Sequence, residues 1–207
     1  YGEYNVGVMY EKGLGIEKDY PEALKWYLKA AKQDLTVGQH ATGVMFHMGW
    51  GVKKDYSEAF KWYQKAAGQG YPASQSNLGV LYQDGTGVDL DYAKALSWYL
   101  KAANQGSSDG MHNVSAIYRE GRGVERDYSK AAEWAIKAGT AVNVGTPDSA
   151  RWVGWAYQNG LGVEQDFGTA LEWYNRAAKQ GHPEVQAYID NLKMVRETHA
   201  SAVKGDA

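Results

Sequence analysis

The chain has 207 residues and a formal net charge of −2, from 22 Lys and Arg against 24 Asp and Glu. It therefore lacks the basic excess typical of nucleic-acid-binding proteins. It has no cysteine, which excludes disulfides and thiolate metal sites, and no apolar run approaches the ~18 residues of a membrane span.

The first residues, Tyr1-Gly2-Glu3, lack an initiator Met, so we interpret the chain as an excised or processed fragment. A leader peptide could have been removed, and a secreted protein can also lack cysteine. The sequence thus leaves the compartment open between periplasmic or secreted and cytoplasmic.

A repeat of 36 residues runs through most of the chain. A tryptophan marks each copy at intervals of 36, 36, 36 and 39 residues: Trp26, Trp62, Trp98, Trp134 and Trp173. An aspartate column keeps the same register: Asp19, Asp55, Asp91, Asp127 and Asp166. The three additional residues lie between Ala138 and Gly145. We place the repeats at about 1–34, 35–70, 71–106, 107–145 and 146–181.

The third copy shows the elements of one unit. Residues 73–84 are predicted to form a helix whose core face carries four residues at the spacing i, i+3, i+4 and i+7: Gln75, Leu78, Gly79 and Tyr82. The turn Gly85-Thr86-Gly87-Val88 then ends the helix, because glycine supplies the positive φ that a helix C-terminus requires.

A second helix follows each turn. Asp91 is predicted to cap it through its carboxylate, and in the first two copies a Glu three residues after the Asp predicts a capping box. Spacings of three and four put one broad apolar face on the helix: Ala95, Trp98, Tyr99, Ala102 and Ala103.

A column of glycines lies in the middle of the first helices: Gly7, Gly43, Gly79 and Gly154, with Ser115 in the fourth copy. Each glycine costs about 1 kcal/mol of helix propensity relative to alanine. We therefore predict that a neighbouring helix or a large ring lies against this column, where a Cβ would clash.

The last segment, 183–200, has an apolar stripe of Val185, Ile189, Leu192 and Val195, which predicts a capping helix with one face on the array. Residues 201–207 are predicted to form a disordered tail. We expect one repeat domain over residues 1–200. The first copy begins within its first helix, so we expect further repeats upstream.

The third copy closely resembles a Sel1-like repeat, a relative of the tetratricopeptide repeat. The residues that carry the resemblance are Asn77-Leu78-Gly79-Val80-Leu81-Tyr82, Gly85-Thr86-Gly87-Val88, Asp91-Tyr92 and Ala95-Leu96-Ser97-Trp98-Tyr99. The resemblance extends over about residues 1–181. It implies an all-α, right-handed α-solenoid of antiparallel helix pairs, with first helices on the concave face, and a scaffold or adaptor role. One bacterial branch of the family is stapled by disulfides, and this chain departs from it.

No residue pattern predicts catalysis. The aspartate column fits helix capping better than paired catalytic carboxylates, and the Gly-x-Gly turns follow helices rather than the strands that precede phosphate-binding loops. No i+4 partner completes a metal site at His40 or His47, and no nucleophile elbow is present. We predict a protein that is not an enzyme and that has no cofactor or metal.

The Ser76, Asn77, Val80 and Gln83 columns are predicted to face the concave groove. The candidate partner-binding residues are His40, His47, Asn77, Gln83, His112, Asn113, Arg119, Arg151, Trp152 and Trp155. Arg151, Trp152 and Trp155 have the composition of an interface hot spot. The alternative is that the two rings pack under the 140–147 insertion or against the C-terminal helix.

Two classes of function fit these observations. The favoured one is a scaffold that binds a protein or peptide partner in the concave groove. The other is an envelope or secreted factor that binds a non-protein ligand or has weak hydrolase activity, which a deep pocket with a perturbed carboxylate or histidine would favour. Self-association through the exposed repeat ends is a further alternative.

Overall fold

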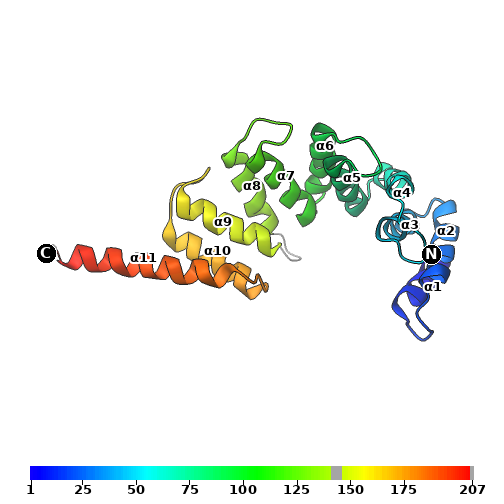
Figure 1. The fold of residues 1–207 in the computed structure, drawn as a ribbon, viewed down its shortest axis with the longest axis horizontal. Coiled ribbons are helices and arrows are strands. Elements are labelled where there is room, and N and C mark those ends of the chain that lie inside the picture. Colours follow the sequence, from blue (N-terminus) through cyan, green and yellow to red (C-terminus); the bar gives the residue numbers. More distant parts are fainter. Residues whose placement is uncertain (141–145, 206–207) are drawn as a thin grey trace. The chain divides into compact units, whose positions relative to one another are not determined.

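The computed structural model describes residues 1–140 and 146–205, with side chains described as far as Val195. Within these residues the chain is all-helical, with consecutive helices paired (Figure 1). The pairs are α1 (Gly2–Lys12) and α2 (Tyr20–Lys32), α3 (Thr36–Met48) and α4 (Tyr56–Gly68), α5 (Pro72–Asp84) and α6 (Tyr92–Asn104), α7 (Ser108–Glu120) and α8 (Tyr128–Thr140), and α9 (Pro147–Asn159) and α10 (Phe167–Lys179). The predicted α-solenoid of helix pairs is confirmed.

The chain divides into two compact units, Tyr1–Gly110 and Met111–Ala207, and each is described by itself. A final helix, α11 (Val185–Gly205), follows the fifth pair and continues past residue 200 into the segment predicted to be a disordered tail. Residues 141–145, on which much of the predicted insertion falls, and residues 206–207 lie outside the described part. Among the described helices, none combines the length and apolar character needed to cross a bilayer.

Each second helix is fixed at its start by an aspartate. The Asp91 carboxylate accepts a hydrogen bond from the backbone N–H of Lys94 at 2.9 Å, which confirms the predicted cap. The backbone N–H of Asp91 donates to the carbonyl of Tyr82, also at 2.9 Å. Only one half of each predicted capping box forms. Asp19 and Asp55 accept from the backbone N–H of the Glu three residues later, but their own N–H groups donate to carbonyls of the first helix. The Glu22 carboxylate pairs with Lys25 instead.

The glycine column lies against a column of buried tyrosine rings on the second helix of the same repeat. A Cβ at Gly7 or Gly43 would lie 2.6 Å from the ring of Tyr27 or Tyr63. The same overlap recurs at Gly79 with Tyr99 and at Gly154 with Tyr174. The prediction of a large ring at this column is confirmed.

The fourth repeat replaces both members of this contact. Ala135 stands in the tyrosine column and Ser115 in the glycine column. The Ser115 hydroxyl donates to the carbonyl of Ala131 at 2.8 Å, so the larger side chain is accommodated where the ring is missing.

In three of the turns the second glycine lies against the preceding repeat. A Cβ at Gly51 would overlap the backbone of Tyr20 and Pro21, at the start of the preceding second helix. Gly87 lies in the same way against Tyr56, and Gly162 against Tyr128. Trp50, beside Gly51, stacks on the Tyr20 ring with centroids 5.2 Å apart. Glycine is therefore required here for two reasons. The backbone has a positive φ, 70° at Gly51, and the preceding repeat lies too close for a side chain.

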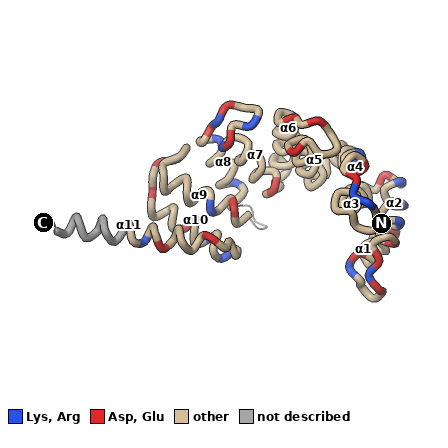
Figure 2. Tube along the Cα trace, in the orientation of Figure 1, with Lys and Arg blue, Asp and Glu red and all other residues tan. Residues whose placement is uncertain are grey.

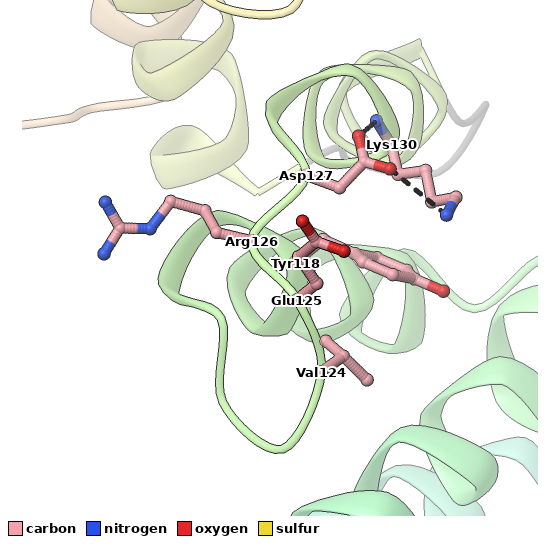
Figure 3. Close-up of a pocket in the computed structure, with 6 residues that line it drawn as sticks. All are labelled: Tyr118, Val124, Glu125, Arg126, Asp127 and Lys130. Atoms are coloured by element: carbon pink, nitrogen blue, oxygen red, sulfur yellow. Dashed lines mark hydrogen bonds and ion pairs between the residues drawn. The ribbon is translucent and has the colours of Figure 1, made fainter.

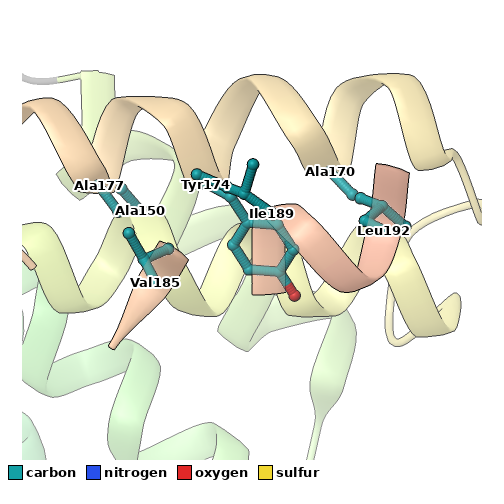
Figure 4. Packing of buried hydrophobic residues seen from close by; sticks show 7 residues of the cluster. All are labelled: Ala150, Ala170, Tyr174, Ala177, Val185, Ile189 and Leu192. Carbon is teal, nitrogen blue, oxygen red and sulfur yellow. The ribbon is translucent and has the colours of Figure 1, made fainter. Parts of the chain in front are cut away.

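The first helix also packs on the preceding repeat through three positions one turn apart. In α5 these are Ser74, Leu78 and Leu81, all fully buried. In α11 the equivalent positions are Val185, Ile189 and Leu192, which pack on Ala170, Tyr174 and Ala177 of α10 (Figure 4). Leu81 was missing from the predicted core face, because a first helix contacts the preceding repeat as well as its own second helix and so buries a wider face.

We expect Gly79→Ala to lower the free energy of unfolding by about 1–3 kcal/mol, because the added Cβ overlaps the Tyr99 ring in a packed core. Urea denaturation followed by circular dichroism measures this loss, which should shrink in a Tyr99→Ala background. The matched control is Gly68→Ala, since Gly68 is helical with nothing within 4 Å of its Cβ position, and this change should be neutral or stabilising by up to about 1 kcal/mol. Equal effects at Gly79 and Gly68 would contradict the ring contact.

Candidate functional site

The first helices carry one stripe of half-buried and exposed side chains at the edge of the core, where Ala41 and Val44 also pack against neighbouring core clusters. On α3 it comprises Val37, Ala41, Val44 and Met48, and on α5 it comprises Ala73, Asn77, Val80 and Asp84. These side chains are half-buried or exposed, and Met48 is 49% exposed. Their i, i+4, i+7, i+11 spacing keeps them on one face of each helix. We call these residues the first-helix stripe.

In the second unit the equivalent positions are less apolar. On α7 they are Asn113, Ala116 and Glu120, and on α9 they are Asp148, Trp152, Trp155 and Asn159. Asn113 and Trp155 are half-buried, whereas Glu120, Asp148 and Asn159 are exposed. Of the predicted partner-binding residues, Asn77, Asn113, Trp152 and Trp155 fall on these positions.

Gln83 and its equivalent Gln158 accept hydrogen bonds within their own repeats. The Tyr99 hydroxyl donates to the Gln83 side-chain oxygen at 3.3 Å, and the Tyr174 hydroxyl donates to that of Gln158 at 2.6 Å. Burial raises the pKa of Tyr174, so its hydroxyl keeps the proton that it donates. The amide of Gln83 is thus turned toward the second helix.

His40 and His112 lie against the following repeat. The Nδ1 atom of His40 is 2.8 Å from the Ser74 hydroxyl, and that of His112 is 2.8 Å from the Ser149 hydroxyl. Ser74 and Ser149 are buried at the start of the next first helix. Burial lowers the pKa of His40 to about 4, so this imidazole is neutral at pH 7. Through these contacts the two histidines help to hold neighbouring repeats together.

His47 lies at the edge of the tyrosine layer. Its ring contacts Tyr56 edge-on at 5.2 Å and Tyr63 at 6.0 Å between centroids. Its Nδ1 atom is buried without a hydrogen-bond partner. Burial lowers the pKa of His47, and the Lys54 charge adds to this effect. Asn77 hydrogen-bonds the Tyr63 hydroxyl through its side chain, although it also lies on the stripe.

Trp152 is a core residue. It is 4% exposed and packs in one cluster with Ala131, Ala132 and Ala135 of α8. Ala135 is the position where the fourth repeat lacks its tyrosine, so the Trp152 ring fills space that the missing ring leaves. Arg119 lies over Trp152, with its guanidinium carbon 5.8 Å from the ring centroid.

Trp155 and Arg151 remain at the surface of the fifth repeat. Both are half-buried, and Trp155 packs against clusters on either side of α9. Trp155 also lines a shallow pocket of about 350 Å³ between α9 and α11, together with Gln158, Asn159, Ala187, Tyr188 and Asn191. The structure therefore separates the predicted hot spot into one core ring and two surface side chains.

A second pocket, of about 410 Å³, lies at the turn before α8 (Figure 3). Two carboxylates line it, Glu125 and Asp127. Asp127 has a structural role, because it accepts from the backbone N–H of Lys130 at 2.8 Å and pairs with the Lys130 ammonium at 3.1 Å. The hydrogen bond from this N–H lowers the pKa of Asp127. Within the residues that the structure covers, no group of three or more potential ligands could hold a metal ion.

Lysine, arginine, aspartate and glutamate are interspersed along the helices and turns of each unit (Figure 2). Five second helices carry a cation over the exposed side of their tryptophan, as Lys29 does over Trp26 at 3.9 Å and Arg176 over Trp173 at 5.4 Å. This pattern is a mixed-charge surface without a basic stripe.

Comparison with known proteins identifies the repeat. A profile of the Sel1 repeat matches residues 1–35, 36–71, 72–107, 108–142 and 147–182. The chain belongs to the Sel1 repeat family. No curated protein matches its sequence.

Two solved Sel1-type structures are similar to this chain over most of its length. A Sel1 repeat protein from Oxalobacter formigenes is 38% identical with a TM-score of 0.83, over 88% of this chain and 74% of that one. A protective antigen of uropathogenic Escherichia coli strains is 36% identical with a TM-score of 0.85, over 92% of this chain. The chain spans 40% of that antigen. Sel1 repeat proteins generally mediate protein–protein interactions and are typically non-enzymatic scaffolds.

We expect the stability of the protein to depend on the protonation of His40. The unfolded chain binds a proton at this residue below pH 6.5, whereas the folded chain does so only near pH 4. As the pH falls from 6.5 to 4, the His40 imidazole should therefore lower the free energy of unfolding by roughly 2–3 kcal/mol. Urea denaturation at pH 7 and pH 4.5 should show a smaller fall in His40→Gln than in the unaltered chain. The same fall in both would contradict the buried, neutral imidazole.

We expect Trp152→Ala to lower the free energy of unfolding by about 3–5 kcal/mol, because it removes a buried ring. Trp155→Ala should cost less, since that ring is only half-buried. Chemical denaturation followed by circular dichroism compares the two variants. Unchanged stability in Trp152→Ala would contradict its place in the core.

Proposed function

We propose that this chain is a non-enzymatic scaffold domain whose protein partner binds the first-helix stripe. The observation that carries the proposal is the difference between the stripe and the neighbouring columns. Gln83, His40 and His112 are hydrogen-bonded within or between repeats, whereas Met48, Ala73 and Asp84 of the stripe are exposed. The two ends of the stripe are therefore the part of the first helices that is most open to another molecule.

The chemistry of the stripe suggests the kind of partner. In the first unit α3 offers an unbroken apolar row that ends at Met48, and methionine adapts its shape to different apolar side chains. Asp84 ends the neighbouring row on α5 and Glu120 ends the row on α7, whereas Asp148 begins the row on α9. A helix or extended peptide with apolar side chains and basic flanking residues would complement this surface.

The mixed charge of the surface favours a protein over a nucleic acid as the partner, because a nucleic acid would require a basic stripe along the binding face. Trp155 and Arg151 would extend the contact in the fifth repeat. Trp152 would support that contact from below through its packing on α8.

We expect Met48→Asp together with Ala73→Asp to abolish partner capture, because both changes put a charge on the exposed stripe. Pulldown with the protein as bait, followed by identification of the retained proteins, compares this variant with the unaltered chain. The matched control is Gln64→Asp, an exposed position on the second helix α4. Both variants should keep the unaltered melting temperature. A partner retained by the stripe variant, or lost equally in the control, would contradict the proposal.

A further inference from the structure

The shallow pocket of about 350 Å³ between α9 and α11 is lined mainly by aromatic rings and amides. The rings are those of Trp155 and Tyr188, and the amides are those of Gln158, Asn159 and Asn191. None of the described residues that line the pocket is charged. Trp155 and Asn159 occupy stripe positions of α9, and Tyr188 and Asn191 occupy two of the same columns on α11. The pocket therefore lies on the face of the first helices that carries the stripe.

The two rings of the pocket are held in place by the core beneath them. Trp155 packs against hydrophobic clusters on either side of α9. The Tyr188 ring stacks on the ring of Tyr174, a core residue of α10 (Figure 4), with centroids 5.4 Å apart and planes 23° from parallel. A ring that is already fixed loses little conformational freedom when a ligand covers it. Trp155 and Tyr188 thus give the pocket a preformed aromatic surface.

The three amides retain more free hydrogen-bond donors than acceptors. The Gln158 side-chain oxygen accepts from the Tyr174 hydroxyl at 2.6 Å, which leaves the NH₂ group of this amide to donate. The Asn159 amide gives one N–H to the carbonyl of Trp155 at 2.8 Å and keeps its other N–H and its oxygen. Asn191 is exposed, and its amide is bonded to none of the residues that the structure describes. The pocket is therefore suited to a ligand that presents acceptors.

A proline-rich peptide is a ligand of this kind. Proline has no N–H group, and the polyproline II helix leaves the carbonyls of the chain without internal partners. Its rings pack on aromatic side chains in shallow grooves. An α-helix, in contrast, bonds most of its carbonyls internally. A neutral sugar presents hydroxyls that donate as well as accept, and the pocket has few free acceptors and no carboxylate to receive them.

We propose that the pocket between α9 and α11 binds a proline-rich peptide segment in the polyproline II conformation. Proline rings of the segment pack on Trp155 and Tyr188, and the amides of Gln158 and Asn191 donate to its carbonyls. This inference rests on the proposed function, because Trp155 lies on a stripe position, and it specifies the class of protein partner at this part of the stripe.

The test uses the whole chain and a fluorescently labelled oligoproline of about nine residues, which is roughly 28 Å long in this conformation. Fluorescence anisotropy should show saturable binding, and a Gly-Ser peptide of the same length should bind at least about tenfold more weakly. Trp155→Ala should abolish binding of the oligoproline. Because this change also removes packing, a second variant, Asn191→Leu, changes only an exposed amide and should weaken binding roughly three- to tenfold.

The matched control is Gln186→Leu, which replaces another exposed amide of α11 outside the pocket lining and should bind like the unaltered chain. Circular dichroism should show the same helix content in the two leucine variants. Equal affinity for the oligoproline and the Gly-Ser peptide, or equal weakening by Asn191→Leu and Gln186→Leu, would overturn the proposal. Displacement of the oligoproline by maltohexaose, an uncharged oligosaccharide, would also overturn it, because the pocket would then bind sugars.

The pulldown with Met48→Asp and Ala73→Asp separates this inference from the proposed function. If that variant loses its protein partner but the unaltered chain does not bind the oligoproline, the stripe binds a partner of another class and the present inference is wrong. If the oligoproline binds in a manner that depends on Trp155 and Asn191 while the stripe variant keeps its partner, the pocket is confirmed and the partner does not require the stripe of the first unit.

Discussion

The contact between a mid-helix glycine and a buried tyrosine ring sets the spacing of the two helices within a repeat. It recurs at Gly7, Gly43, Gly79 and Gly154, where a side chain would overlap the ring. The ring lies against the first helix, and its hydroxyl donates to the Gln83 or Gln158 side chain in the last turn of that helix. The fourth repeat shows that the glycine and the tyrosine are lost together. Once Ala135 removes the ring, Ser115 enters the glycine column and Trp152 of the next repeat fills the space beside α8.

The same spacing governs how repeats join. A helix pair held at this distance presents two alanines and an aromatic residue to the next repeat, whose Gly-x-Gly turn and small first-helix residues fit against them. Each repeat is thus stabilised by its own core and by its neighbours, as in other solenoids. The hydrogen bonds of His40 to Ser74 and of His112 to Ser149 add polar links between repeats. This explains why polar side chains on the first helices do not by themselves indicate a binding surface.

The sequence predicts the helices, caps and glycine contacts well, because each depends on local spacing or on one column read across the copies. It predicts the surface less well. The Leu81 column is buried because a first helix touches two repeats, and a periodicity drawn from one helix cannot show the second contact. Trp152 resembled a binding residue by its type and its place in the groove column. The signal that could have placed it in the core was the simultaneous loss of the tyrosine at Ala135, which only a comparison between neighbouring repeats reveals.

The residues of a repeat fall under two different constraints. Met48 and Asp84 are exposed on the first-helix stripe, so they can vary without disturbing the stacking, and specificity for a partner can reside there. The residues between repeats cannot vary in this way, because a Cβ at Gly38 would lie 2.8 Å from Ala30 and one at Gly51 would overlap the backbone of Tyr20. Partner specificity can therefore change along the stripe while the stacking of the repeats is preserved.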